Sequence, residues 1–239
     1  MPIDGYKIIQ AVMEGSRIRE SKGIIPIFGV YLSLFFVRYY NRLSFEFEKR
    51  LGEDRGPEAA SYLVAAAQEC GYATFQGIRN SWEWQQLVQP MIEKPEDQIL
   101  GFTAMAEAFG WGALEVLDIQ PGQSLRLQVR DSYEATGYLQ DYGQAKTGKC
   151  YMLQGVAAAF MDLLYGEDYP DGCFCFQAQE VGCRAMGDLT CEFLAQKNNQ
   201  GNDLLGVGKK RHGNSPEGLD PGEQHRASDP SRGSGNRYR

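Results

Sequence analysis

The stretch Glu180-Val-Gly-Cys183-Arg-Ala-Met-Gly187-Asp188-Leu-Thr-Cys191-Glu-Phe193 says most about the fold. A glycine followed by an aspartate favours a tight turn between two strands, so we expect a hairpin that places Cys183 and Cys191 a few ångströms apart. Glu180 reaches the same point if its strand bulges. One carboxylate and two thiolates form most of a tetrahedral zinc site.

The fourth ligand of such a site would come from another part of the chain. Our first candidate is Cys150, at the start of a predicted helix, and Cys173 or Cys175 on the preceding strand are alternatives. A simpler interpretation also fits, in which the cysteines are reduced thiols packed as small hydrophobic groups and Glu180 is solvated. Spacing alone leaves both open, because the paired C-x-x-C units of a zinc ribbon are absent.

Three helices are predicted from apolar residues that recur every three or four positions. The first begins at Gly56-Pro57, and Gly71 is expected to end or bend it. The second begins at residues 95–97, where acidic side chains favour the positive end of a helix dipole. The third runs from about Cys150 to Tyr165.

Two antiparallel hairpins are predicted in the second half of the chain. Pro121-Gly122 is a strong turn signal between alternating segments at 114–118 and 125–130, which form the first hairpin. The second joins strands near Cys173–Gly182 and Thr190–Ala195. Helices followed by hairpin, helix and hairpin predict an α+β domain, with an antiparallel sheet of two hairpins packed against helices.

Composition divides the 239 residues into three parts. We expect a helical N-terminal extension over 1–41, the α+β domain over 42–196 and a disordered tail over 197–239. The tail has eight glycines, three prolines and a single aromatic residue, too little apolar surface to offset the entropy of ordering it. Both histidines, His212 and His225, lie in the tail, so the sequence excludes histidine-dependent catalysis from the folded part.

The net charge of −7 disfavours binding to nucleic acid or to anionic lipid, because both need a concentrated positive surface. Residues 1–10 lack the basic start and apolar stretch of a secretory signal, so we expect a cytoplasmic protein. The apolar run Ile24–Val37 has 14 residues and contains Pro26 and Gly29. A spanning helix needs about 20 residues, so this run is predicted to be a buried helix or a peripheral contact with a membrane surface.

The motif Glu180-x-x-Cys183-x-x-x-Gly187-Asp188-x-x-Cys191-x-Phe193, after a helix that opens Cys150-Tyr-Met-Leu-Gln-Gly155, resembles the 4-vinyl reductase domain family. That family includes a protein linked to bacteriochlorophyll 4-vinyl reduction and the domains of phenol-sensing regulators, and it is structurally related to the TRAPP subunits. The resemblance covers roughly Arg42 to Ala195. It implies an apolar pocket between sheet and helices, a homodimer, and zinc held by the glutamate and the cysteines of the motif. The sensors place their fourth ligand, a cysteine, within the helix, where this chain has Ala157 to Ala159.

Aromatic residues are the candidates for lining such a pocket. The alternative is that they belong to the core. A planar apolar molecule such as a tetrapyrrole would suit them. The candidate ligand-binding residues are Phe102, Phe109, Trp111, Phe160 and Phe176. Two further tryptophans, Trp82 and Trp84, either anchor a partner or lie on a half-buried amphipathic segment.

We therefore predict a small-molecule-binding protein that holds a tetrapyrrole or another apolar ligand, in chlorophyll metabolism or photosystem assembly. One alternative is a 4-vinyl reductase that uses an external electron donor. Another is a regulatory or scaffold module that acts in trans through protein contacts. We predict no catalytic residue, because no G-x-G-x-x-G follows a strand and no acid–base pair of defined geometry is visible.

Overall fold

The structure is a computed structural model that describes residues 3–15, 25–169 and 171–198. The predicted tail therefore lies outside the described residues from position 199 onwards, together with both histidines. No helix in the described ranges is long and apolar enough to cross a membrane.

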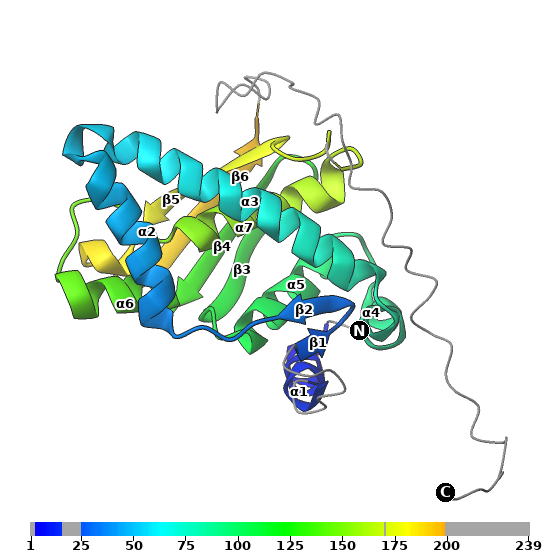
Figure 1. The fold of residues 1–239 in the computed structure, drawn as a ribbon. Coiled ribbons are helices and arrows are strands. Elements are labelled where there is room, and N and C mark those ends of the chain that lie inside the picture. Colours follow the sequence, from blue (N-terminus) through cyan, green and yellow to red (C-terminus); the bar gives the residue numbers. More distant parts are fainter. Residues whose placement is uncertain (1–2, 16–24, 170, 199–239) are drawn as a thin grey trace, which may run out of the picture. The chain divides into compact units, whose positions relative to one another are not determined.

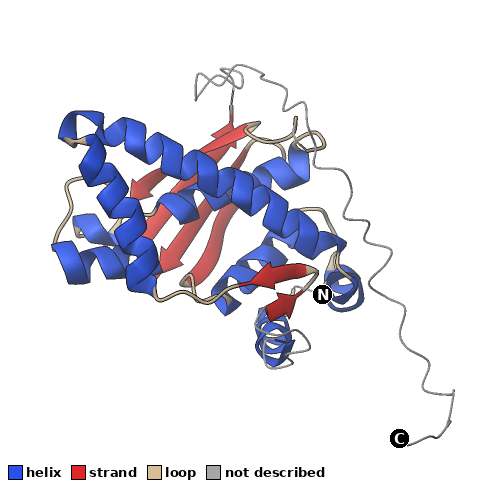
Figure 2. Ribbon diagram, in the orientation of Figure 1, coloured by secondary structure: helices blue, strands red, loops and turns tan. Residues whose placement is uncertain are grey.

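A four-stranded antiparallel sheet lies at the centre of the α+β fold (Figure 2). Its strand order is β3-β4-β6-β5, so the two predicted hairpins are confirmed and are joined by pairing between β4 and β6. The strands are β3 (Ala113–Gln120), β4 (Ser124–Arg130), β5 (Phe176–Gly182) and β6 (Cys191–Lys197).

One face of the sheet carries the core. Leu127 of β4 lies opposite Phe193 of β6, and both side chains are fully buried. Helix α7 (Tyr151–Tyr165) packs on this face against β4, β5 and β6, and helix α3 (Gly56–Asn80) packs on α7. Figure 1 shows α3, in cyan, crossing the sheet on the side that α7 covers.

Gly71 does not end the first predicted helix. Helix α3 continues through it to Asn80 and is 25 residues long in all. Gly71 lies instead where α3 meets α7, since a Cβ atom at this position would be 3.0 Å from Val156 Cγ2. The glycine thus permits close contact between the two helices. In sequence, a glycine that ends a helix cannot be told from one that allows close packing.

The N-terminal region is only partly helical. After helix α1 (Gly5–Gly15), residues within the apolar run Ile24–Val37 form a short hairpin of β1 (Ile25–Ile27) and β2 (Val30–Leu32). The predicted buried helix is therefore wrong. The hairpin turns at Phe28 and Gly29, which have positive φ angles of 47° and 74°, and Pro26 has no amide hydrogen to continue a helix. The run then leads, with exposed side chains, into α2 (Val37–Leu51).

The remaining elements are helical. Helix α5 (Asp97–Ala108) confirms the helix predicted to begin at residues 95–97. Helix α6 (Tyr133–Tyr142) was not predicted, and Ser132 caps it by accepting a hydrogen bond from the Ala135 amide. The other short elements are α4 (Trp82–Leu87), η1 (Glu53–Arg55), η2 (Gln89–Met91) and η3 (Arg184–Met186).

Candidate functional site

Four acidic or thiol side chains meet where the second hairpin approaches the start of α7. The potential ligand atoms of Cys150, Glu180, Cys183 and Cys191 all lie within 4.8 Å of one another. The three cysteines are buried and Glu180 is partly buried. The structure therefore brings all four predicted ligands together, with Cys150 rather than Cys173 or Cys175 as the fourth member.

Glu180 was expected to reach the cysteines if its strand bulges, and the strand does bulge. The register of β5 against β6 shifts between Glu180 and Gly182. Gly148 leaves room for the carboxylate, since a Cβ atom there would lie 2.2 Å from Glu180 Oε2. The backbone amide of Cys150 donates to the same oxygen at 3.1 Å, which fixes Glu180 at the start of α7.

The connection between the two strands is longer than the predicted tight turn. Residues 183–190 contain the 3₁₀ turn η3, followed by Gly187 with a φ angle of 110°. Asp188 closes this loop by accepting a hydrogen bond from the Cys183 amide at 2.7 Å. The loop therefore still returns the chain so that Cys191 lies beside Cys183.

Distances in this cluster are compatible with a tetrahedral metal ion. Cys150 Sγ and Cys191 Sγ are 3.5 Å apart. Two sulfurs bound to one tetrahedral zinc would be about 3.8 Å apart, given Zn–S bonds of about 2.3 Å. Glu180 Oε1 is buried and has no hydrogen-bond partner among the described residues, so a cation at the centre would satisfy it.

The protonation states also favour a cation. Hydrogen bonds from the Cys150 and Cys183 thiols lower the pKa of Cys191 to about 4, and the Arg184 amide adds a further bond to its sulfur. Burial raises the pKa of Glu180 to about 8. The cluster thus holds a stabilised thiolate, Cys191, and a carboxyl group, Glu180, whose ionised form is unfavourable unless a cation is bound nearby.

A second buried carboxyl group holds the start of α7. Glu134 of α6 accepts hydrogen bonds from the backbone amides of Met152 and Leu153 at 2.9 and 3.1 Å. Burial raises the pKa of Glu134 to about 8. Ser132 Oγ lies 3.2 Å from Cys150 Sγ, so α6 positions both the helix end and the thiol.

Lys149, next to Cys150, connects this region to α2. Its Nζ lies 2.5 Å from Glu48 Oε1, and Tyr151 donates a hydrogen bond to the other oxygen of Glu48 at 2.8 Å. Lys149 is 5% exposed, so this ion pair is largely shielded from water. Sequence reasoning gave no signal for the pair, because its partners are about a hundred residues apart.

The aromatic residues predicted to bind a ligand form a cluster, with one exception. Phe102 and Phe160 are buried with ring centroids 5.4 Å apart. Phe75, which was not predicted, contacts both and also reaches Trp111 at 6.2 Å. Phe109 packs on Trp111 at the partly exposed edge. Phe176 lies apart from these rings and contacts Tyr165.

Trp84 completes this aromatic cluster. Its ring lies 5.0 Å from that of Phe102 and is fully buried, whereas Trp82 is 73% exposed. The indole Nε1 of Trp84 is buried and has no hydrogen-bond acceptor within the described part of the chain. A buried donor without an acceptor is rare in proteins and calls for an explanation.

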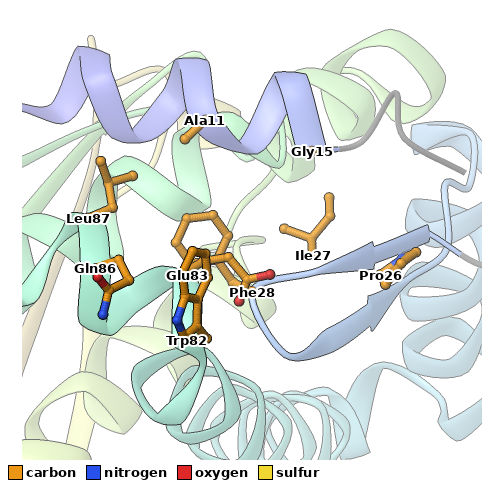
Figure 3. Close-up of a pocket in the computed structure, with 9 residues that line it drawn as sticks. All are labelled: Ala11, Gly15, Pro26, Ile27, Phe28, Trp82, Glu83, Gln86 and Leu87. Atoms are coloured by element: carbon orange, nitrogen blue, oxygen red, sulfur yellow. The ribbon is translucent and has the colours of Figure 1, made fainter. Parts of the chain in front are cut away.

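Two surface cavities are lined by residues outside the aromatic cluster. One, of about 230 Å³, is formed by α1, the β1 strand with its turn, and α4, with Ile27, Phe28 and Trp82 among its lining residues (Figure 3). The other, of about 510 Å³, is lined by residues that include Tyr133, Gln140 and Arg184. None of the five predicted ligand-binding residues lines either cavity.

Comparison with known proteins identifies the fold. No family model and no curated protein sequence matches the chain. Among solved structures, the phenol-responsive sensory domain of the transcription activator PoxR, in a crystal structure with phenol, matches with a TM-score of 0.65 and 17% identity. The match covers 85% of this chain and 94% of that domain. The chain has the fold of the PoxR sensory domain.

Two further structures match with lower TM-scores. Trafficking protein particle complex subunit 3 from Naegleria fowleri, covalently bound to palmitic acid, has a TM-score of 0.47 and 9% identity over 68% of this chain and 95% of that one. A vinyl-4-reductase family protein from Methanocaldococcus jannaschii has a TM-score of 0.43 and 14% identity over 80% and 93%. The PoxR match confirms the fold that the sequence motif implies.

Proposed function

We propose that this protein, with its PoxR-type fold, binds a planar apolar small molecule in the aromatic cluster. The observation that carries the proposal is the buried indole N–H of Trp84, which has no acceptor among the described residues. Leaving such a donor unpaired costs roughly 1–3 kcal/mol. A ligand with an oxygen atom at the edge of an aromatic ring would satisfy the donor and stack on Phe102 or Phe160. The PoxR domain was crystallised with phenol, which has this chemistry.

The dense packing of the cluster favours a ligand of about the size of phenol. Entry would be at the partly exposed edge formed by Phe109 and Trp111. The larger ligand that we propose as an alternative is a tetrapyrrole of chlorophyll metabolism or photosystem assembly, on the strength of the 4-vinyl reductase motif. Either ligand would require these closely packed rings to move apart, and a tetrapyrrole would require a far larger opening than phenol, so the two ligand classes predict structural responses of different size.

We propose zinc as the metal of the Cys150, Glu180, Cys183 and Cys191 site, in a protein that acts as a homodimer in the cytoplasm. Four ligands without an open position are typical of a structural zinc ion. When bound, zinc would link the second hairpin to the start of α7 and neutralise the charge of the thiolates. The protein's own groups, the Ser132 hydroxyl and the Arg184 amide, lie within hydrogen-bond distance of two of the sulfurs and orient them.

Ligand binding can be tested by titrating the purified protein with phenol and, separately, with protoporphyrin. Tryptophan fluorescence follows the first titration and porphyrin absorbance the second. We expect Trp84→Phe to weaken binding about tenfold, since the lost hydrogen bond is worth about 1.4 kcal/mol. Trp82→Phe is the matched control and should bind as the wild type does. Saturable binding that is equally strong in both variants, or no binding of either compound, would overturn the proposal.

A further inference from the structure

The loop before α2 and the first half of this helix expose large apolar side chains. Figure 1 shows the loop leading from β2 into the start of α2. We call the exposed apolar surface of these residues the α2 apolar face. It comprises Leu34 (73% exposed), Phe35 (67%), Phe36 (89%), Tyr39 (59%) and Leu43 (61%).

The area of the α2 apolar face is large for a protein surface. If a fully exposed large apolar residue presents about 200 Å², these fractions correspond to roughly 700 Å². The largest apolar patch of a typical monomer is about 300–600 Å². Patches above this size mark sites of contact with another protein or with a membrane. The α2 apolar face therefore calls for an occupant.

The fold holds these apolar side chains in place. The carbonyl oxygen of Phe36 accepts hydrogen bonds from the amides of Tyr39 and Tyr40 at 2.9 and 3.4 Å, which fixes the end of the loop to the helix. The ring of Phe35 stacks on that of Tyr39, with centroids 5.5 Å apart. On the inner side of α2, buried Phe45 packs on Tyr138 of α6. The exposed rings are thus carried by a packed element.

Basic side chains lie next to the α2 apolar face. Arg38 and Arg42 each come one position before an apolar member of the face, so they form a second row beside Tyr39 and Leu43 on the helix. Their side chains are 71% and 50% exposed. Both pair with Asp141, at 3.1 and 3.6 Å, so two cations share one carboxylate. The guanidinium groups keep further N–H donors for a phosphate oxygen.

The charge of α2 is opposite in sign to that of the whole chain. The helix contains four basic and two acidic residues, a net of +2, whereas the chain has a net charge of −7. One of the acidic residues, Glu48, pairs with Lys149 of the core. Two more acidic residues, Glu53 and Asp54, follow the helix and lie at least ten positions beyond Leu43. The net charge of the chain therefore does not describe the first half of α2.

We propose that the α2 apolar face binds the surface of a membrane that contains anionic lipid. Leu34, Phe35 and Phe36 enter the boundary between headgroups and acyl chains, and Arg38 and Arg42 donate hydrogen bonds to lipid phosphates. An apolar face next to basic side chains is typical of helices that lie at a membrane surface. The loop stays at this boundary, because the polar groups of its irregular backbone need water.

The proposal agrees with one of the two interpretations that the sequence left for the run Ile24–Val37. The structure excludes the buried helix and leaves the last part of the run exposed. The other interpretation was a peripheral contact with a membrane surface. The membrane contact goes beyond the proposed function and depends on neither the bound small molecule nor the metal.

Flotation of the purified 239-residue chain with lipid vesicles tests the apolar part of the proposal. We expect the wild type to bind vesicles of equal parts phosphatidylcholine and phosphatidylglycerol. Phe35→Ala/Phe36→Ala should bind at least tenfold more weakly, because two rings that enter the membrane are lost. Trp82→Ala removes a ring that is equally exposed, on α4, and should bind as the wild type does. Circular dichroism verifies that both variants fold.

The basic row is tested by the dependence of binding on lipid charge. A basic side chain near an anionic surface increases affinity about fivefold. Arg38→Gln/Arg42→Gln should therefore bind the mixed vesicles at least fivefold more weakly than the wild type does, and lose most of its preference for them over pure phosphatidylcholine. The control is Lys209→Gln/Lys210→Gln/Arg211→Gln, which removes the basic cluster near the C-terminus and should bind as the wild type does.

Three results would overturn the proposal. One is a wild type that does not bind the mixed vesicles at micromolar protein and millimolar lipid. Another is binding that Phe35→Ala/Phe36→Ala leaves unchanged, or that is lost only when the basic cluster at 209–211 is removed. The third is self-association of a wild type that binds no vesicles, if Phe35→Ala/Phe36→Ala abolishes it, because the α2 apolar face would then be a protein contact.

Discussion

The backbones of α3 and α7 approach closely at Gly155, and this contact gives a quantitative prediction. A Cβ atom at Gly155 would lie 2.4 Å from the carbonyl oxygen of Val64 and 2.7 Å from the amide nitrogen of Gln68. Ordinary van der Waals contact begins near 3.4 Å, so Gly155→Ala requires a displacement of about 1 Å. Both neighbouring atoms belong to the α3 backbone, which cannot turn aside as a side chain can.

Gly71, on the other helix of the same contact, is the matched control. A Cβ atom there would approach Val156 Cγ2 at 3.0 Å and Ala159 Cβ at 3.2 Å. A side-chain methyl group can yield by a few tenths of an ångström. Both Gly→Ala changes gain about the same helix propensity, up to about 1 kcal/mol, so comparison of the two isolates the steric effect.

We expect Gly155→Ala to be less stable than Gly71→Ala by about 2 kcal/mol, within the usual range for overpacking a tight core. The displacement should also reach Cys150, at the start of the same helix. Zinc ligands tolerate deviations of about 0.2 Å, so a displacement of about 1 Å should weaken metal retention. Urea unfolding followed by circular dichroism measures the first effect, and metal content after gel filtration measures the second. If Gly155→Ala is as stable as Gly71→Ala and keeps its metal, the reasoning about this contact is refuted.

Two further predictions concern buried charges. Asp162 accepts hydrogen bonds from the backbone amides of Phe174 and Phe176, and burial raises its pKa from 3.8 to about 6. A carboxyl group with a raised pKa stabilises the folded state most below its unfolded pKa and loses that contribution as the pH rises through the folded value. The difference in unfolding free energy between wild type and Asp162→Asn should therefore shrink by up to about 3 kcal/mol from pH 4 to pH 7. Urea titrations at both pH values measure it, and a difference that does not vary with pH would contradict the assignment. Glu48→Gln leaves the buried Lys149 ammonium without its counterion and should destabilise the fold by about 3 kcal/mol. Glu58→Gln breaks the exposed pair with Arg55 and should leave the urea denaturation midpoint almost unchanged. If Glu48→Gln and Glu58→Gln lower the midpoint equally, the Lys149–Glu48 pair is not shielded from water.

Local patterns were sufficient to predict the sheet and the metal-site candidates. Leu125, Leu127 and Val129 alternate with polar residues, and all three are buried on one face of β4. The spacing of Glu180, Cys183 and Cys191 places these residues together because one hairpin and one bulge are enough to do so. Cys150 could only be named as one of several candidates, because its approach depends on how α7 packs on the sheet.

The predictions that failed depended on tertiary contacts or on backbone angles that the apolar pattern does not show. Gly71 resembles a helix end in sequence, but its missing side chain serves the contact with Val156. For the run Ile24–Val37 we expected a buried helix or a contact with a membrane surface, and the helix is wrong, because residues 25–32 form a hairpin and Leu34, Phe35 and Phe36 are exposed. Sequence alone could not distinguish core rings from pocket rings, and the unpaired indole of Trp84 became apparent only once its surroundings were known.

The zinc content of the purified 239-residue chain tests the central claim, that the Cys150, Glu180, Cys183 and Cys191 cluster is a metal centre. Elemental mass spectrometry after gel filtration should find one zinc per chain in the wild type. A Cys183→Ser/Cys191→Ser variant should lose the zinc, whereas a Cys173→Ser/Cys175→Ser variant should retain it. A wild type that is free of zinc, or equal zinc content in both double variants, would contradict the account.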